Sequence, residues 1–252
     1  GNEGAIGMKK YGLKGVFFDC WSTVITFSER RKDWNTAPLK RHAKEYGKID
    51  WNKVDAFSEG FFSRYYASTK YEIQYCQFLN LIMTYFNIDL DCPISKLDHE
   101  VFDGLDPKPV QGIEDFLSFL DKEGYFYAIL SNTIYKDEDS FSLVKKLIPS
   151  SNFSYFFGSS DIGMKKPDKE FFLAASRKSG ISLSESMYIG DTFYQDVYGS
   201  SKAGFAFSVW MNSRNKKKED YASVCDVSYP TYSEVHDYHE LIQLFQKGAF
   251  QK

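Results

Sequence analysis

Cysteine is sparse in this sequence. Only four cysteines occur among 252 residues, at positions 20, 76, 92 and 225, and no two have the C-x-x-C spacing of redox or zinc motifs. No histidine lies near them at metal-site spacing. Scattered thiols suit a reducing compartment better than a disulfide framework. We therefore expect a cytoplasmic protein without structural disulfides.

Long apolar runs and an excess of basic residues are also missing. No apolar run approaches the ~20 residues of a membrane-spanning helix, and residues 1–10 lack the apolar core of a signal peptide. The formal net charge is -3, whereas a general nucleic-acid binder normally has a basic surface. We expect a soluble protein with neither a membrane nor a nucleic-acid partner. No pattern indicates an oligomeric state, and Met8 is the expected natural start.

Short apolar runs that end in polar residues recur along the chain. They occupy residues 14–19, 125–130, 153–157, 187–189 and 205–210, with a weaker candidate at 225–228. Such continuous runs suit buried strands of a parallel sheet. Helical spacing of apolar residues alternates with them, at 112–123, 169–179, 196–202 and 233–246. The alternation predicts an α/β fold, with a Rossmann-like, doubly wound parallel sheet as its core.

Residues 30–102 interrupt this alternation. They contain no good strand run, but many apolar and aromatic residues at helical spacing. Residues 106–109, the run Asp-Pro-Lys-Pro, are typical of turns that lead back to the sheet. The aromatic residues are expected to pack the helices together, although they could also recognise a ring-bearing substrate.

The interruption predicts two domains. We expect a core domain made of residues 1–28 and 107–252, with an inserted α-helical cap domain at residues 29–106.

Polar residues follow several of the predicted strands. They are Asp19, Ser131, Asn132, Lys166, Asp191 and Asp196. Ligands of open α/β sheets bind outside the carboxyl ends of the strands, so these side chains should converge. Three carboxylates at one point would repel one another unless a cation lay among them, and oxygen ligands suit Mg²⁺. Lys166 and Ser131 could then hold an anionic group that the metal also contacts.

These residues lie in four motifs that resemble those of the haloacid dehalogenase (HAD) superfamily. Residues 16–23 (VFFDCWST) resemble the first motif, a hydrophobic strand followed by D-x-D-x-T, and Ser131-Asn132 resembles the second. Residues 163–168 (GMKKPD) resemble the third, and residues 190–196 (GDTFYQD) match the fourth, G-D-x-x-x-x-D. The motifs cover nearly the whole sheet domain in the family's order, and the insert lies where the family places one class of cap.

The resemblance implies a phosphatase-like hydrolase that acts on a small phosphorylated metabolite through an aspartyl-phosphate intermediate. Asp19 would be the nucleophile, and Lys166 would neutralise charge on Asp19 and on the phosphate. Phosphate-binding residues would be Thr23, Ser131, Asn132 and Lys166. The ligands of Mg²⁺ would be Asp19, the backbone carbonyl of Trp21, Asp191 and Asp196.

Two basic features are expected to lie outside the site. Lys165 is one position away from the motif lysine, so we expect it to be a surface residue. Residues 214–220 form the only charge run, which we expect to be a solvated loop.

Trp21 departs from the first motif. Phosphatases of the family carry a second aspartate there, which protonates the leaving oxygen, whereas an indole has no usable acid–base chemistry near neutral pH. General acid–base catalysis contributes roughly 100- to 10,000-fold. We rank first a phosphohydrolase that takes its proton from elsewhere. His42 and His99 in the insert are candidate donors, although surface or packing roles are more usual for such histidines.

Two alternatives remain open. The second-ranked interpretation is a weakly active or inactive relative that binds a phosphorylated ligand in a regulatory role. The third is a 2-haloacid dehalogenase, in which an aromatic residue stands at this position and a halide leaves without a proton. Asp191 and Asp196 argue against it, because a carboxylate substrate attacked at carbon gains nothing from additional acids nearby.

Overall fold

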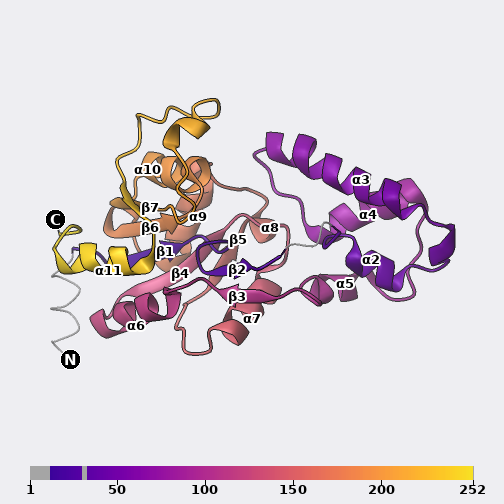
Figure 1. The fold of residues 1–252 in the computed structure, drawn as a ribbon, viewed down its shortest axis with the longest axis horizontal. Coiled ribbons are helices and arrows are strands. Elements are labelled where there is room, and N and C mark those ends of the chain that lie inside the picture. Colours follow the sequence, from indigo (N-terminus) through magenta and orange to yellow (C-terminus); the bar gives the residue numbers. More distant parts are fainter. Residues whose placement is uncertain (1–11, 30–32, 252) are drawn as a thin grey trace.

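A computed structural model of the chain describes residues 12–29 and 33–251. Its centre is a six-stranded sheet with the order β5-β4-β1-β6-β7-β8, in which all neighbours are parallel (Figure 1). The strands are β1 (Gly15–Phe18), β4 (Phe126–Ser131), β5 (Phe156–Gly158), β6 (Ser186–Gly190), β7 (Phe207–Met211) and β8 (Ser233–Val235). The chain winds outward from β1 to β5 and then from β6 to β8. The predicted doubly wound α/β fold is confirmed.

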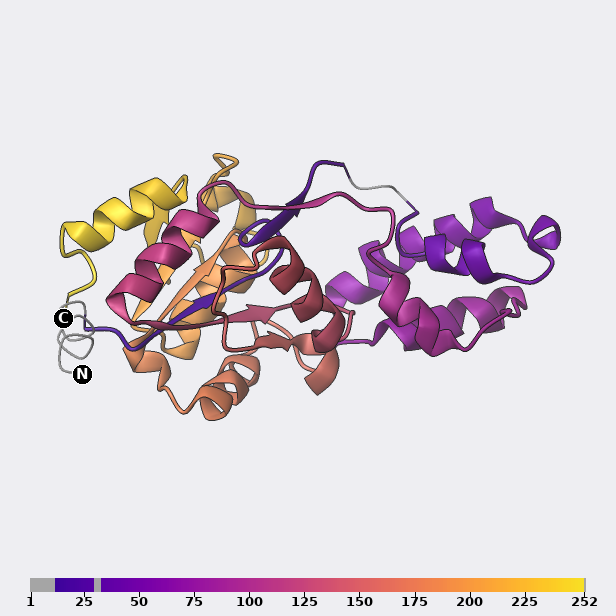
Figure 2. The same ribbon diagram turned by 90° about the horizontal axis from the view of Figure 1, so that it is seen from below.

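Helices cover both faces of this sheet (Figure 2). One face packs against α6 (Ile113–Glu123), α7 (Asp137–Leu147) and α11 (Tyr238–Gln246), and the other against α9 (Lys169–Ser179) and α10 (Gly199–Ala203). Phe18 of β1 joins the first apolar cluster and Phe17 the second, because successive strand residues point to opposite faces. Shorter segments are α8 (Ser159–Ile162), η4 (Leu183–Glu185), η5 (Phe193–Tyr198) and η6 (Lys218–Tyr221).

We call residues 29–106 the insert. Its described part, residue 29 and residues 33–106, forms a helical body beside the sheet in both views (Figures 1 and 2). Its helices are α2 (Ala37–His42), α3 (Trp51–Gly60), α4 (Tyr75–Phe86) and α5 (Ile94–Glu100), with short turns η1 (Tyr46–Lys48), η2 (Phe61–Tyr65) and η3 (Tyr66–Ser68). Leu39, Val54 and Phe78 lie in an apolar cluster of the insert, which Ile134 and Tyr135 of the sheet domain join. The expected start at Met8 lies outside the described residues, and so do the two outer ends of the expected core domain, residues 1 and 252.

A two-stranded antiparallel ribbon lies at the base of the insert. It pairs β2 (Ile25–Phe27) with β3 (Pro107–Pro109), and residues 106–109 had been predicted as turns. The N–H of Val110 donates to the carbonyl of Val24 at 2.9 Å. The two prolines of β3 fall at the alternate, non-hydrogen-bonded pairs of the ladder, so their missing N–H groups cost no bond.

The C-terminal prediction was wrong in two places. Residues 225–228 form turns rather than a strand, and the last strand is β8, within the predicted helix 233–246. Helix α11 begins only at Tyr238, where the Asp237 side chain accepts the N–H of Glu240 as an N-cap. Val235 supplied part of the apparent helical period but lies in β8. Among the described helices, none has the length and apolar character needed to cross a bilayer.

Candidate active site

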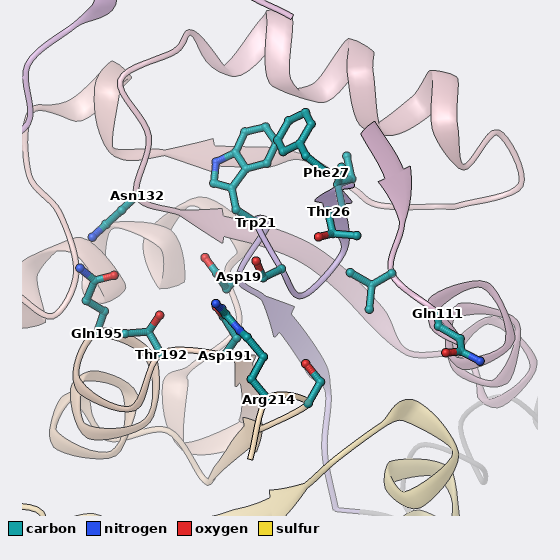
Figure 3. Close-up of a pocket in the computed structure, with 14 residues that line it drawn as sticks. Asp19, Trp21, Thr26, Phe27, Gln111, Asn132, Asp191, Thr192, Gln195 and Arg214 are labelled. Carbon is teal, nitrogen blue, oxygen red and sulfur yellow. The ribbon is translucent and has the colours of Figure 1, made fainter. Parts of the chain in front are cut away.

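The winding of the sheet reverses between β1 and β6. Asp19 follows β1 and Asp191 follows β6, so both carboxylates lie at the carboxyl edge of the sheet, where ligands of such folds bind. A cavity of about 810 Å³ opens there, and both residues line it (Figure 3). We call this the first cavity.

The loop after β1 places its side chains by a tight turn. The carbonyl of Cys20 accepts N–H groups from Thr23, Val24 and Ile25, so the chain reverses directly after Asp19. Trp21 then faces the first cavity. Thr23 is fully buried, and its hydroxyl lies 3.4 Å from Oδ2 of Asp19. The structure therefore brings Thr23 to the candidate nucleophile, although it does not line the cavity.

Lys166 contacts Asp19 without lining the first cavity itself, and it is almost completely buried, at 1% exposure. Its ammonium donates to Oδ1 of Asp19 at 2.9 Å, to Oδ1 of Asp196 at 2.7 Å and to the hydroxyl of Tyr188 at 2.7 Å. Burial alone would lower the pKa of Lys166, but the carboxylates of Asp19 and Asp196 raise it above its ordinary value. The lysine therefore stays charged.

The three predicted acids form one cluster. Asp19, Asp191 and Asp196 each offer an oxygen within 4.8 Å of the other two. Burial raises the pKa of Asp19 to about 7 and that of Asp196 to about 6, against the opposing effect of Lys166. Repulsion between the acids adds to this rise. A divalent cation would relieve such repulsion, and an all-oxygen donor set fits Mg²⁺.

Gly190 allows Asp196 to reach the cluster. A Cβ atom at Gly190 would lie 2.3 Å from Cγ of Asp196, which no side chain could tolerate. Asp196 is also fixed by the N–H of Thr192, which donates to its Oδ2 at 3.0 Å. The fourth motif thus has a steric reason for its glycine as well as a chemical reason for its acids.

Asn132 holds the loop that carries Lys166. Its amide nitrogen donates to the Lys166 carbonyl at 2.9 Å, and its amide oxygen accepts the Lys166 N–H at 2.7 Å. Asn132 also lines the first cavity. Ser131, in contrast, is fully buried, and its hydroxyl donates to the Asn132 carbonyl at 3.4 Å. Ser131 is not among the lining residues, so its hydroxyl does not reach the cavity surface.

Trp21 forms a wall of the site. Its indole stacks on Phe27, with ring centroids 5.5 Å apart, and packs at a tilt against Phe102 of the insert. Figure 3 shows Trp21 and Phe27 together, with Asp19 between Trp21 and Asp191. Trp21 also lines a second cavity, of about 560 Å³, which lies toward the insert. The indole therefore faces the site and packs under the insert at the same time.

Arg214 and Tyr188 are among the residues at the site that were not predicted. Arg214 begins the charge run that we expected to be a solvated loop, and nearly all of residues 214–220 are exposed. Its guanidinium nevertheless donates to Oδ2 of Asp191 at 2.8 Å and lines the first cavity (Figure 3). Its position shortly after β7 was the available signal. Tyr188 lies inside β6, and nothing in the local sequence distinguishes it from an ordinary core tyrosine.

The expectation for Lys165 was wrong. Its exposure is 7%, and its ammonium donates to the Tyr66 carbonyl of the insert at 2.7 Å. The loop before Lys166 packs against the insert instead of facing solvent. The two candidate histidines lie elsewhere: His42 bonds with Asp91 and Glu100, His99 with Asp139, and neither lines the first cavity.

A family model described as "Haloacid dehalogenase-like hydrolase" matches residues 54–209. Among curated relatives, a glyceraldehyde 3-phosphate phosphatase from Methanopyrus kandleri is 30% identical over 91 residues, which cover 36% of this chain and 37% of that protein. A protein of the same name from Pyrococcus furiosus is 26% identical over 144 residues, 56% of this chain and 55% of that one. The chain therefore spans only 37% and 55% of the length of these relatives.

Solved structures share the fold. A HAD phosphatase from Thermococcus onnurineus aligns with a TM-score of 0.59 at 19% identity, over 92% of this chain and 98% of that one. A 2-haloacid dehalogenase from Pseudomonas syringae aligns with the same TM-score of 0.59 at 18% identity, over 93% and 99%. The equal TM-scores for a phosphatase and a 2-haloacid dehalogenase establish the fold of this chain. They do not distinguish between phosphatase and dehalogenase activity.

Proposed function

The chain belongs to the family of haloacid dehalogenase-like hydrolases, and on that basis we propose that it is a Mg²⁺-dependent phosphatase of a small phosphorylated metabolite. The observation that carries the proposal is the buried Lys166 ammonium between Asp19 and Asp196, next to Asp191. Such an arrangement suits a doubly charged phosphoryl group better than a neutral reacting centre. The two relatives named as phosphatases support the same reaction class.

The proposed reaction has two steps. A carboxylate oxygen of Asp19 attacks phosphorus, and the bond from phosphorus to the leaving oxygen breaks. That oxygen takes its proton from water, because the indole of Trp21 cannot supply one. Water then attacks the phosphorus of the aspartyl-phosphate, which releases inorganic phosphate and restores the carboxylate of Asp19.

In this proposal the surrounding residues hold one another in place and balance the charge of the phosphate. Lys166 reduces the repulsion between Asp19 and the phosphate, and Asn132 holds the lysine loop in place. Mg²⁺ held by Asp19, Asp191, Asp196 and the Trp21 carbonyl would supply positive charge at the phosphoryl oxygens. Phosphate contacts from Thr23, Ser131 and Lys166 remain part of the proposal, although Asn132 is the only one of the four phosphate-binding candidates that lines the first cavity.

We also propose that the insert is a cap domain, with residues 1–28 and 107–252 as the core. Its separate apolar cluster and the cavity between it and the sheet domain support this division. A cytoplasmic location is proposed on the basis of four free cysteines, which suit a reducing compartment.

The dehalogenase alternative rests on one observation. An aromatic side chain at Trp21 removes the acid that a phosphatase would use, and a leaving halide would not need it. Against this alternative, the clustered acids would repel a carboxylate substrate attacked at carbon. We therefore rank it below the phosphatase and below a binding protein that retains the site without rapid turnover.

Phosphate release distinguishes the three. The full chain is assayed with an aryl and an alkyl phosphate, in Mg²⁺ and in EDTA, beside Asp19→Asn. We expect Mg²⁺-dependent release that Asp19→Asn abolishes, with the aryl ester faster because its leaving group needs no proton. Thermal unfolding of Asp19→Asn checks that the variant is folded. Halide release from a haloacid without metal would instead establish the dehalogenase, and Mg²⁺ binding without any release would establish the binding protein.

A further inference from the structure

The second cavity meets the first at two side chains. Trp21 and Asn132 line both, and Trp21 follows Asp19 by two residues. A group bonded to a phosphate over Asp19 can therefore extend past the indole into the second cavity. At about 560 Å³ the second cavity has room for a substituent larger than a short alkyl chain.

Aromatic rings form much of its wall. Trp21, Trp34, Phe62 and Tyr135 all line it, from segments far apart in the chain. Trp34 packs edge-on against Tyr135 with centroids 5.4 Å apart, and the Tyr135 hydroxyl donates to the side chain of Asn35. Rings fixed in this way offer flat apolar surfaces at little entropic cost, and they favour planar ligands that stack or meet them edge to face.

The described lining of the second cavity carries charge of one sign only, and that sign is negative. Among the described residues that line it, Glu59 is the only one with a charged side chain, and it is exposed to solvent. The remaining polar groups, such as Ser58 and Ser63, are neutral. The buried ammonium of Lys165 lies 3.6 Å from the ring centroid of Tyr66, which lines the cavity, but Lys165 itself is not part of the lining. A second negative charge on the substrate would find no cationic side chain among the described residues that line this cavity.

We propose that the second cavity binds the leaving group, and that the substrate is a phosphate monoester of a planar, ring-bearing alcohol that is neutral or cationic. This inference rests on the proposed phosphatase function and names its substrate class. The aromatic wall selects the ring, since stacking and cation–π contacts both favour it. Glu59 selects against a second anion and favours a cation at the open side of the cavity.

The test uses esters that differ in the leaving group alone. Benzyl, propyl, 4-carboxybenzyl and 4-(aminomethyl)benzyl phosphates all release an alkoxide, which is a poor leaving group, so the missing acid affects all four esters alike. We expect kcat/KM for benzyl phosphate to exceed that for propyl phosphate by about tenfold, the size of one or two aromatic contacts. The carboxybenzyl ester should be the slowest of the ring-bearing esters and the aminomethyl ester the fastest. Equal values for benzyl and propyl phosphate would overturn the proposal.

Two variants connect the preference to the second cavity. Phe62→Leu keeps an apolar side chain but removes the ring, and it should lower kcat/KM for benzyl phosphate more than that for propyl phosphate, so that the ratio of the two values falls. Glu59→Lys at an exposed position should reverse the order of the carboxybenzyl and aminomethyl esters. An unchanged order in Glu59→Lys would overturn the assignment of charge selectivity to Glu59.

A second measurement covers the case in which no ester is hydrolysed. The phosphatase proposal would then fail, but the second cavity can still be tested by calorimetric binding of benzylphosphonate and propylphosphonate with Mg²⁺. A Kd about tenfold lower for benzylphosphonate, lost in Phe62→Leu, would support the ring-binding cavity. Equal affinity, or no binding of either, would overturn it.

Discussion

Lys165 and Lys166 are neighbours in the chain, but they lie in two different regions of the molecule. Lys166 lies at the candidate active site, where the carboxylates of Asp19 and Asp196 and a phenol surround its ammonium. Lys165 lies at the contact with the insert, where it meets the Tyr66 carbonyl and ring. Both are buried, yet the first is balanced by full negative charges and the second mainly by dipoles.

The difference in partners has an electrostatic consequence. The acids raise the pKa of Lys166, whereas burial lowers the pKa of Lys165, and Glu72 opposes that only in part. A lysine that keeps its charge beside carboxylates suits phosphate chemistry. A lysine bonded to a backbone carbonyl suits the holding of one segment against another.

The contact around Lys165 extends over both sides of the boundary. Glu72 of the insert accepts the Tyr66 hydroxyl at 2.7 Å and binds the hydroxyl of Ser159 in the sheet domain. The N–H of Glu72 donates to the Gly163 carbonyl at 2.8 Å. One loop of the sheet domain thus carries the lysine of the site and, one residue earlier, a buried lysine that contacts the insert. We expect changes at the contact to affect the site, but more weakly than changes within it.

Lys166→Met should have the largest effect. It removes the only ammonium hydrogen-bonded to Asp19 in the described structure and leaves buried acids uncompensated. We expect kcat/KM for an aryl phosphate to fall by about 100- to 1,000-fold, since that is the usual cost of removing one group that stabilises the charge of a transition state. Lys165→Met is the matched control one residue away. Comparable losses in the two variants would remove the distinction between the two lysines.

Trp21→Asp should have the next largest effect, and it should increase activity. It places a carboxyl group where the two cavities meet, two residues after the candidate nucleophile. General acid catalysis predicts a gain of about 100-fold in kcat for alkyl phosphates and little gain for aryl phosphates. Trp21→Asn is the matched control, because asparagine has nearly the same shape as aspartate but carries no acid. An equal gain in Trp21→Asn would mean that the missing ring, rather than the new acid, changes the rate.

Much of the candidate active site could be predicted from the sequence. The apolar runs that became β1 and β6 predicted strands, and the rule that ligands bind at the carboxyl ends of parallel strands brought Asp19 and Asp191 together. The structure also places Asp196 and Lys166 beside them. These positions depend on local patterns and on one general property of parallel sheets.

Other features depend on partners distant in sequence. The strand β3 forms at Pro107–Pro109 because β2 pairs with it, and prolines give no sign of that pairing. Lys165 is buried because the insert covers its loop, although it looks like a surface lysine in the sequence. Tyr188 reaches Lys166 from within a strand. Burial and side-chain direction at a contact between segments are set by tertiary packing, which no local window contains.

Lys165→Met should have a moderate effect that appears mainly in stability. It removes a charged hydrogen bond at a buried site, which is worth about 1.5–3 kcal/mol in the free energy of unfolding. The apolar chain of Met preserves most of the packing, so the rate should fall much less than in Lys166→Met. Lys169→Met, at an exposed position, is the control for loss of one positive charge. Chemical unfolding of the wild type, Lys165→Met and Lys169→Met measures the free energy of unfolding of each protein. Equal free energies for the two variants would contradict the prediction.

Glu72→Gln should have the smallest effect. We expect it to change the pH dependence of the protein's stability. Burial raises the pKa of Glu72 from its ordinary 4.5, although Ser159, Tyr66 and Lys165 oppose this. The folded state therefore holds the Glu72 proton more tightly than the unfolded state does. The stability that this proton contributes is fully present below pH 4.5 and is lost as the pH rises through the raised pKa.

Other buried carboxylates, including Asp19 and Asp196, shift in the same direction, so the informative quantity is the difference between two proteins. Wild type should lose thermal stability as the pH rises above 4.5, and Glu72→Gln, which stays neutral throughout, should lose less of it. The melting temperature of both proteins across that range measures the difference. Parallel curves would show that Glu72 has the same proton affinity in the folded and unfolded states, and that the contact with the insert contributes no pH dependence of its own.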